Sequence, residues 1–168
     1  AINSVRPKLW ATRGVDLLGP VAYLDVDGTI APTTGARKQG MDMSYKGIWG
    51  YAPLIVSLAN TKEVLYLVNR PGNAPSHQGA PAWIDKAIDL VAPHAPRVCL
   101  RGDTDFSLTA HFDAWAERVD FIFGMDNSSA LRCRAEAVEE SAWRRLERPA
   151  AYQNVTGQVR ARRADTKA

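Results

Sequence analysis

The sequence predicts an α/β fold with a mixed sheet, in which an antiparallel hairpin and parallel strands are flanked by helices. The first observation is the short apolar run 21–24, which ends in Asp25 and Asp27 and is typical of a buried strand. The second is a pair of β-rich runs within 47–71, joined by a polar connection too short for a parallel crossover. The third is the alternation of helical spacing with short apolar runs after residue 80.

The first half of the chain gives the hairpin and its surroundings. Residues 1–20 are expected to form a loosely packed lead-in with one short helix. The polar stretch 31–46 is expected to be a long loop, and loops of this length tend to be functional or disordered. The hairpin then pairs residues near 51–58 with 63–68, and the strand that starts at Val21 is expected to join this ribbon.

The second half predicts helices alternating with inner strands. Apolar spacing over 83–91 predicts a helix, which Pro residues stop, and 97–100 follows as a strand parallel to the first one. Residues 107–118 are expected to form a helix capped by Ser107, and 119–123 the next inner strand. A helix of mixed charge is expected from Ser128 or Ser129 to about residue 146.

Composition limits the class of protein. No apolar run in the 168 residues approaches the roughly 20 that a membrane span needs. The net charge is only +3, but the end of the chain from Arg144 is basic and suits an anionic partner or a solvated tail. Two isolated cysteines indicate neither a disulfide framework nor a zinc ribbon, which favours the reducing cytoplasm.

Carboxylates at the ends of two predicted strands are the candidate functional groups. Asp25 and Asp27 would share one face of their strand, and two such charges repel unless a cation or proton lies between them. Asp103 and Asp105 follow the strand 97–100 in the same way. If the two strands are parallel, the acids meet at one sheet edge, where hard oxygen ligands suit Mg²⁺ or Mn²⁺ and phosphoryl transfer. The alternative is that Asp25 and Asp27 only cap a turn.

The local sequence around the first acids resembles one family of phosphoryl-transfer enzymes. Asp25-Val26-Asp27-Gly28-Thr29 is similar to the nucleophile motif of haloacid-dehalogenase-type phosphatases. This resemblance implies that Asp25 attacks phosphorus and that Asp27 acts as acid or base. The family has a parallel sheet, however, which the predicted hairpin contradicts.

A broader resemblance covers residues 1–157. It rests on several motifs in order: Leu24-Asp25-Val26-Asp27-Gly28-Thr29, Tyr45-Lys46-Gly47, Gly50-Tyr51-Ala52-Pro53-Leu54, Arg70-Pro71-Gly72-Asn73 and Arg101-Gly102-Asp103-Thr104-Asp105-Phe106. Together they resemble DDE-type transposases of bacterial insertion sequences, which have an RNase H-like catalytic core. The resemblance implies an incomplete core over 21–146, preceded by the lead-in and followed by a basic tail or the start of an inserted region over 147–168.

The resemblance also implies functional residues and partners. Asp27 and Asp103 become the catalytic, metal-binding aspartates, with Asp25 as a supporting metal residue and Mg²⁺ or Mn²⁺ as cofactor. Lys46, Arg70 and Arg101 become candidates for binding the phosphates of DNA. DNA is the expected partner, a homodimer is a candidate assembly, and the expected location is the bacterial cytoplasm at the nucleoid.

One member of the DDE set is expected to be missing. These transposases place their third carboxylate, a Glu, on a helix beyond an inserted β-rich region, and the chain stops near the start of that region. Glu136, Glu139 and Glu140 are alternatives, although a charged helix face is the favoured explanation of these residues. The isolated fragment is therefore expected to be catalytically inactive.

Overall fold

The computed structural model describes residues 2–13, 17–35 and 38–145, which form two compact units. The first unit ends at Asp126 and the second begins at Asn127. The main sheet and all strands among the described residues belong to the first unit. The predicted basic tail, 147–168, lies outside the described residues.

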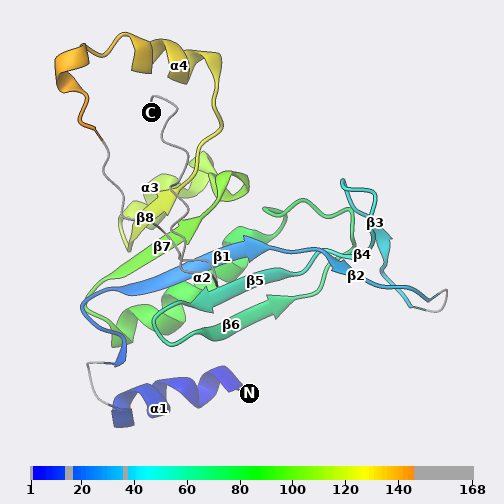
Figure 1. The fold of residues 1–168 in the computed structure, drawn as a ribbon. Helices are drawn as coiled ribbons and strands as arrows, with labels where there is room; N and C mark the ends of the chain where they lie inside the picture. The colour runs from blue at the N-terminus through cyan, green and yellow to red at the C-terminus, as the bar shows by residue number, and fades with distance from the viewer. Residues whose placement is uncertain (1, 14–16, 36–37, 146–168) are drawn as a thin grey trace, which may run out of the picture. The chain divides into compact units, whose positions relative to one another are not determined.

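The first unit is built on a five-stranded mixed sheet (Figure 1). Its strands, in spatial order, are β6 (Glu63–Val68), β5 (Leu54–Leu58), β1 (Ala22–Gly28), β7 (Val98–Gly102) and β8 (Asp120–Phe123). Strand β5 is antiparallel to both β6 and β1, whereas β1, β7 and β8 are parallel to one another. This arrangement confirms the predicted mixed sheet, and the fold is RNase H-like.

A tight turn makes the β5–β6 hairpin. The amide of Lys62 donates to the carbonyl of Ala59 at 3.3 Å, and Lys62 adopts a positive φ of 59°. Asn60 ties this turn to the start of β1, because its side chain accepts from the amide of Tyr23 and donates to the carbonyl of Val21. The polar connection that predicted the hairpin therefore also anchors the central strand.

One face of the main sheet carries the hydrophobic core. Strand β1 alternates buried and partly exposed residues, so that Leu24 and Val26 face the core while Tyr23 and Asp25 face the opposite side. Helix α2 (Ala80–Val91) covers the core face with apolar residues at helical spacing. These are Ala80, Ile84, Ala87, Ile88 and Val91. The predicted helix is thus confirmed and begins a few residues earlier than expected.

The segment after β7 differs from the prediction. A long helix capped by Ser107 was expected, but the chain makes two 3₁₀ turns, Thr104–Phe106 and Thr109–His111, before the short helix α3 (Phe112–Ala116). The Ser107 hydroxyl donates to the carbonyl of Thr104 and caps no helix. The buried side chain of Phe106 holds this segment against the core, so tertiary packing replaces the regular helix that residue spacing favoured.

A small three-stranded sheet lies beyond the carboxyl end of β1, where a long loop was expected (Figure 1). It consists of β2 (Ala31–Pro32), β4 (Trp49–Tyr51) and β3 (Asp42–Met43), in that order. Two glycines allow its close packing: a Cβ on Gly50 would lie 2.2 Å from the carbonyl oxygen of Ala31, and one on Gly72 would lie 2.1 Å from that of Asp42. Strands of two or three residues leave too little alternation for recognition from sequence.

The lead-in is fixed to the edge of the main sheet. It contains a 3₁₀ turn (Ile2–Ser4) and helix α1 (Arg6–Arg13). Arg6 pairs with Glu63 at 3.2 Å and donates to the carbonyl of Val64 at 2.6 Å. The indole of Trp10 donates to Glu63 at 3.0 Å and is itself buried. The lead-in is therefore part of the packed core rather than loosely attached.

The described part of the second unit is short and exposed. Helix α4 (Ser129–Glu136) begins where expected, because Ser128 accepts a hydrogen bond from the amide of Leu131 at its amino end. It ends ten residues before the predicted end near residue 146, and a 3₁₀ turn, Glu140–Ala142, follows. No residue of α4 is buried, so the helix has no core face.

Candidate active site

Two exposed aspartates lie at the carboxyl ends of adjacent parallel strands. The β1–β7 register pairs Asp25 with Arg101 as its last residues. Asp27 and Asp103 each lie two residues further along, and both are exposed. Because strand side chains alternate and the backbone of Asp103 is extended, both aspartates follow the sheet face opposite the core. The parallel strands predicted from sequence therefore bring the two aspartates to the same sheet edge.

The turn after β7 holds Asp103 in a defined conformation. Its Oδ1 accepts a hydrogen bond from the amide of Asp105 at 3.0 Å, which begins the 3₁₀ turn 104–106. The next strand approaches this segment closely, since a Cβ on Gly124 would lie 3.0 Å from Cγ2 of Thr104. One carboxylate oxygen of Asp103 is thus occupied by the backbone, and Oδ2 has no hydrogen-bond partner among the described residues.

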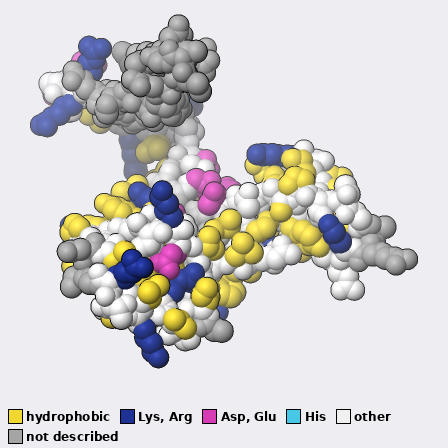
Figure 2. All heavy atoms as spheres, turned by 60° about the horizontal axis from the view of Figure 1, so that its bottom comes forward, with side chains coloured by type: hydrophobic (Ala, Val, Ile, Leu, Met, Phe, Trp, Pro, Cys, Tyr) yellow, Lys and Arg dark blue, Asp and Glu magenta, His cyan; other side chains and the backbone are white. Residues whose placement is uncertain are grey.

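Asp25 and Asp27 have different surroundings. Both oxygens of Asp25 accept from Arg101, at 2.7 Å from Nε and 2.9 Å from Nη2, and the guanidinium lies 4.6 Å above the ring of Tyr23. The hydrogen bond with Asp25 raises the pKa of Arg101 above its ordinary value. Within the described ranges, by contrast, the carboxylate of Asp27 has neither a hydrogen bond nor an ion pair. Its carboxylate is available to a ligand, and Figure 2 shows that acidic side chains (magenta) reach the surface on the face that it draws.

These carboxylates fit part of a divalent-metal site. Asp27 and Asp103 offer the hard oxygen atoms that Mg²⁺ and Mn²⁺ prefer. No group of three or more Asp, Glu, His or Cys side chains that could hold a metal exists among the described residues. Glu136, Glu139 and Glu140 are exposed and belong to the second unit, in or after α4. In the described part of the first unit, two of the predicted metal residues are thus free to bind, whereas Arg101 holds both oxygens of the third, Asp25.

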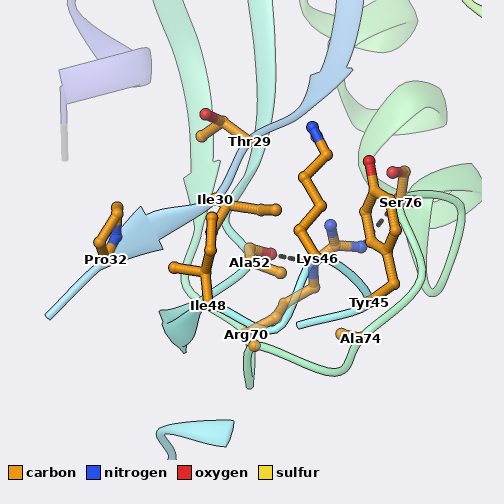
Figure 3. Close-up of a pocket in the computed structure, with 12 residues that line it drawn as sticks. Thr29, Ile30, Pro32, Tyr45, Lys46, Ile48, Ala52, Arg70, Ala74 and Ser76 are labelled. Atoms are coloured by element: carbon orange, nitrogen blue, oxygen red, sulfur yellow. Dashed lines mark hydrogen bonds between the residues drawn. The ribbon is translucent and has the colours of Figure 1, made fainter. Parts of the chain in front are cut away.

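A pocket of about 320 Å³ opens directly after β1 (Figure 3). Lys46 and Arg70, both predicted from the sequence, line it, whereas Arg101 is not among its lining residues. Ser76 and Ile48 also line it, and neither was predicted from the sequence as a site residue. Gly28 leaves room for Ser76, because a Cβ at position 28 would lie 2.8 Å from the serine hydroxyl oxygen. Only the Gly-Pro-rich tract around Ser76 signalled a turn, and nothing in it indicated a pocket.

The geometry also bears on the phosphatase alternative. The antiparallel pairing of β5 with β1 and β6 is not the parallel sheet that this alternative requires. In addition, both oxygens of Asp25, its proposed nucleophile, are hydrogen-bonded to Arg101. The RNase H-like sheet, with exposed aspartates at the ends of two adjacent parallel strands, instead agrees with the transposase resemblance.

Comparison with known families agrees with this resemblance. Residues 21–165 match the family described as transposase DDE domain, group 1, so the chain belongs to this transposase family. The domain is that of an enzyme acting on DNA, in a family that generally uses divalent metal ions. No curated protein matches the chain. None of the helices within the described residues has the length and apolar character needed to cross a membrane.

Proposed function

We propose that Asp27 and Asp103 are the first two catalytic carboxylates of a transposase that cleaves DNA at element ends and joins it to a target with Mg²⁺ or Mn²⁺. The supporting observation is the placement of both exposed aspartates two residues beyond the last β1–β7 pair. Each hard-cation bond is only about 2.0–2.6 Å long, so neighbouring strand ends are the required geometry.

The protein contributes position and charge. When bound, the metal ions supply activation of a water and then of a DNA 3′-hydroxyl, and they offset charge at phosphorus. The exposed carboxylate of Asp27 is free to turn toward a cation. The hydrogen bond from the Asp105 amide to Oδ1 of Asp103 instead fixes the direction of Oδ2 of Asp103. The chain thereby orients the phosphodiester for in-line attack.

The cationic residues take different parts in this proposal. Asp25 supports the site by holding Arg101 beside it, so that the guanidinium contacts DNA phosphates from a fixed position. Lys46 and Arg70 contact DNA from the pocket after β1. A homodimer on DNA remains a prediction for the assembled transposase.

The third carboxylate lies outside the first unit in this proposal. Two aspartates hold Mg²⁺ loosely, because this ion dehydrates reluctantly and needs help from substrate phosphates. The 168-residue chain is therefore expected not to nick supercoiled DNA with either metal. Metal-dependent nicking that is lost in Asp27→Asn would instead show that a third ligand is present, with Glu136, Glu139 and Glu140 as the candidates.

The test of function uses the full-length protein encoded by the same gene. Nicking of a donor plasmid that carries the element is measured in Mg²⁺ and in Mn²⁺ for wild type, Asp27→Asn, Asp103→Asn and the control Asp113→Asn. Asp113 is an exposed aspartate of α3. Both site variants should be inactive and the control active. Metal-dependent nicking that survives Asp27→Asn would refute the assignment.

A further inference from the structure

The pocket after β1 has a cationic side and an apolar side. Figure 3 shows Lys46, Tyr45, Ser76 and the guanidinium of Arg70 on one side, and Ile30, Ile48 and Pro32 on the other. Its volume of about 320 Å³ is at the lower end of the range for small-molecule sites, roughly 300–1,000 Å³. The pocket is therefore larger than a single anion requires, and its two sides suit a ligand with an anionic and a less polar part.

Arg70 carries a buried donor without a partner. Its Nε donates to the carbonyl of Ala52 at 2.9 Å, and its Nη1 to the carbonyls of Pro75, Ser76 and Gln78. Its Nη2 is buried and has no hydrogen-bond partner among the described residues. An unsatisfied donor on a charged group is costly, and an anion in the adjacent pocket would offset part of the cost of burying this charge.

The environment of Arg70 favours an anionic ligand in particular. Burial lowers the pKa of Arg70 from its ordinary value, because desolvation disfavours the charged form. The guanidinium still remains protonated at neutral pH. It makes no ion pair with a carboxylate in the described ranges. Its charge is therefore held in place by neutral carbonyls and left without a counter-ion.

Lys46 adds a second cation from a rigid turn. The amide of Ser44 donates to the carbonyl of Ile48 at 2.9 Å, and the Ser44 hydroxyl accepts from the amide of Ile48 at 3.1 Å. Gly47 completes this turn with a positive φ of 69°. The turn presents Lys46 with its ammonium 5.3 Å from the ring centroid of Tyr45. A pre-formed turn reduces the entropy lost when the lysine binds an anion.

We infer that this pocket binds one sugar–phosphate unit of a DNA strand, with the phosphate near the Arg70 guanidinium, Lys46 and the Ser76 hydroxyl and the sugar against Ile30 and Ile48. The inference rests on the proposed action on DNA. Beyond that action, the inference places the bound DNA strand beside Asp27, since Gly28 and Thr29 line the pocket directly after that residue. In this mode the protein contacts the sugar–phosphate backbone of the DNA and not its bases.

The experiment measures binding of a short labelled DNA duplex to the purified chain by fluorescence anisotropy, over a series of salt concentrations in EDTA. Lys46→Gln removes a pocket charge, and Ile48→Trp or Ala74→Leu fills the pocket without changing the net charge. Lys86→Gln is the matched control, because Lys86 also lies over an aromatic ring, that of Trp83, but does not line the pocket. Thermal unfolding checks that each variant is folded.

The expected result is a smaller salt dependence in Lys46→Gln, with the logarithmic slope reduced by about 0.9 for one lost phosphate contact. Folded filling variants should lose at least as much slope, whereas Lys86→Gln should keep the slope of wild type. Filling variants that bind like wild type while Lys46→Gln is weakened would overturn the pocket and leave Lys46 as a surface charge.

Competitors identify the source of the phosphate. Deoxyribose 5-phosphate should displace the duplex from wild type more effectively than inorganic phosphate, and an uncharged methylphosphonate duplex should not compete. Better competition by inorganic phosphate would indicate a site for free anions and refute the inference. Because EDTA removes the metal, failure of catalysis by Asp27 and Asp103 would leave these binding results unchanged, and the two proposals fail separately.

Discussion

At the scale of single residues, the partner of each carboxylate sets its part in the site. Asp25 and Asp27 are two positions apart on one strand. Arg101 donates to both carboxylate oxygens of Asp25, whereas the carboxylate of Asp27 has no partner among the described residues. An ion pair of this exposure, about 40% for each side chain, contributes about 0.2–1 kcal/mol to stability. Its main effect is therefore positional: it keeps one arginine at the strand end.

The hydrogen-bond partners of Glu63 make its contribution to stability depend on pH. Burial raises its pKa, but hydrogen bonds from Thr61, Trp10 and Arg6 outweigh burial, so the pKa lies below its ordinary value of 4.5. The unfolded chain then binds a proton before the folded one as the pH falls. The stabilisation is complete above about pH 4.5 and is lost as the pH falls through the folded pKa.

We predict that Glu63→Gln lowers the free energy of unfolding by about 1–2 kcal/mol at neutral pH and by less in acid. Chemical denaturation over a series of pH values measures this convergence. The exposed Glu117→Gln is the control and should run parallel to wild type. A Glu63→Gln deficit that does not shrink in acid would show that the charge of Glu63 is not the cause.

At the scale of elements, aromatic packing positions strand β7, which Asp103 directly follows. Helix α3 and strand β8 form a cluster in which Phe112 lies 4.8 Å from Phe121 and Trp115 lies 5.8 Å from Phe123, between ring centroids. Trp115 is fully buried, and its indole donates to Asp85 of α2 at 3.0 Å. This cluster holds β8 against β7, and Asp103 directly follows the end of β7 at Gly102.

We predict that Trp115→Ala destabilises the fold by about 3–5 kcal/mol, because it leaves a large cavity and removes the indole hydrogen bond to Asp85. Trp115→Phe, which keeps the ring contacts but loses the hydrogen bond, should cost less. Trp49→Ala is the matched control, since Trp49 is 46% exposed. Urea unfolding measures all three, and a similar loss for the two alanine variants would contradict the account.

At the scale of the whole molecule, long-range regularity was predictable and local packing was not. The mixed sheet followed from one connection too short for a crossover and from apolar runs that ended in acids, and both features are local in sequence. The small sheet β2–β4–β3 has strands too short for period-two alternation, and it depends on close approach at Gly50 and Gly72. The helix expected from Ser107 gave way to the burial of Phe106.

The candidate site was predictable in the same degree. Asp27 and Asp103 could be placed at one edge because strand direction and register decide it. The engagement of Asp25 by Arg101 depends on a cross-strand pair that no spacing reveals. The pocket depends on Arg70 folding the segment 71–78 around itself through backbone carbonyls, which is a tertiary effect.

The most direct test of the central claim, that Asp27 and Asp103 share one divalent cation, is paramagnetic broadening by Mn²⁺ in the NMR spectrum of the isotope-labelled chain. Broadening acts at low occupancy and so detects a loosely bound ion. The account predicts that amides of 25–29 and 101–105 broaden together, that Asp27→Asn and Asp103→Asn each abolish both effects, and that Asp113→Asn abolishes neither. Broadening at one strand end that survives loss of the aspartate at the other would contradict a shared cation.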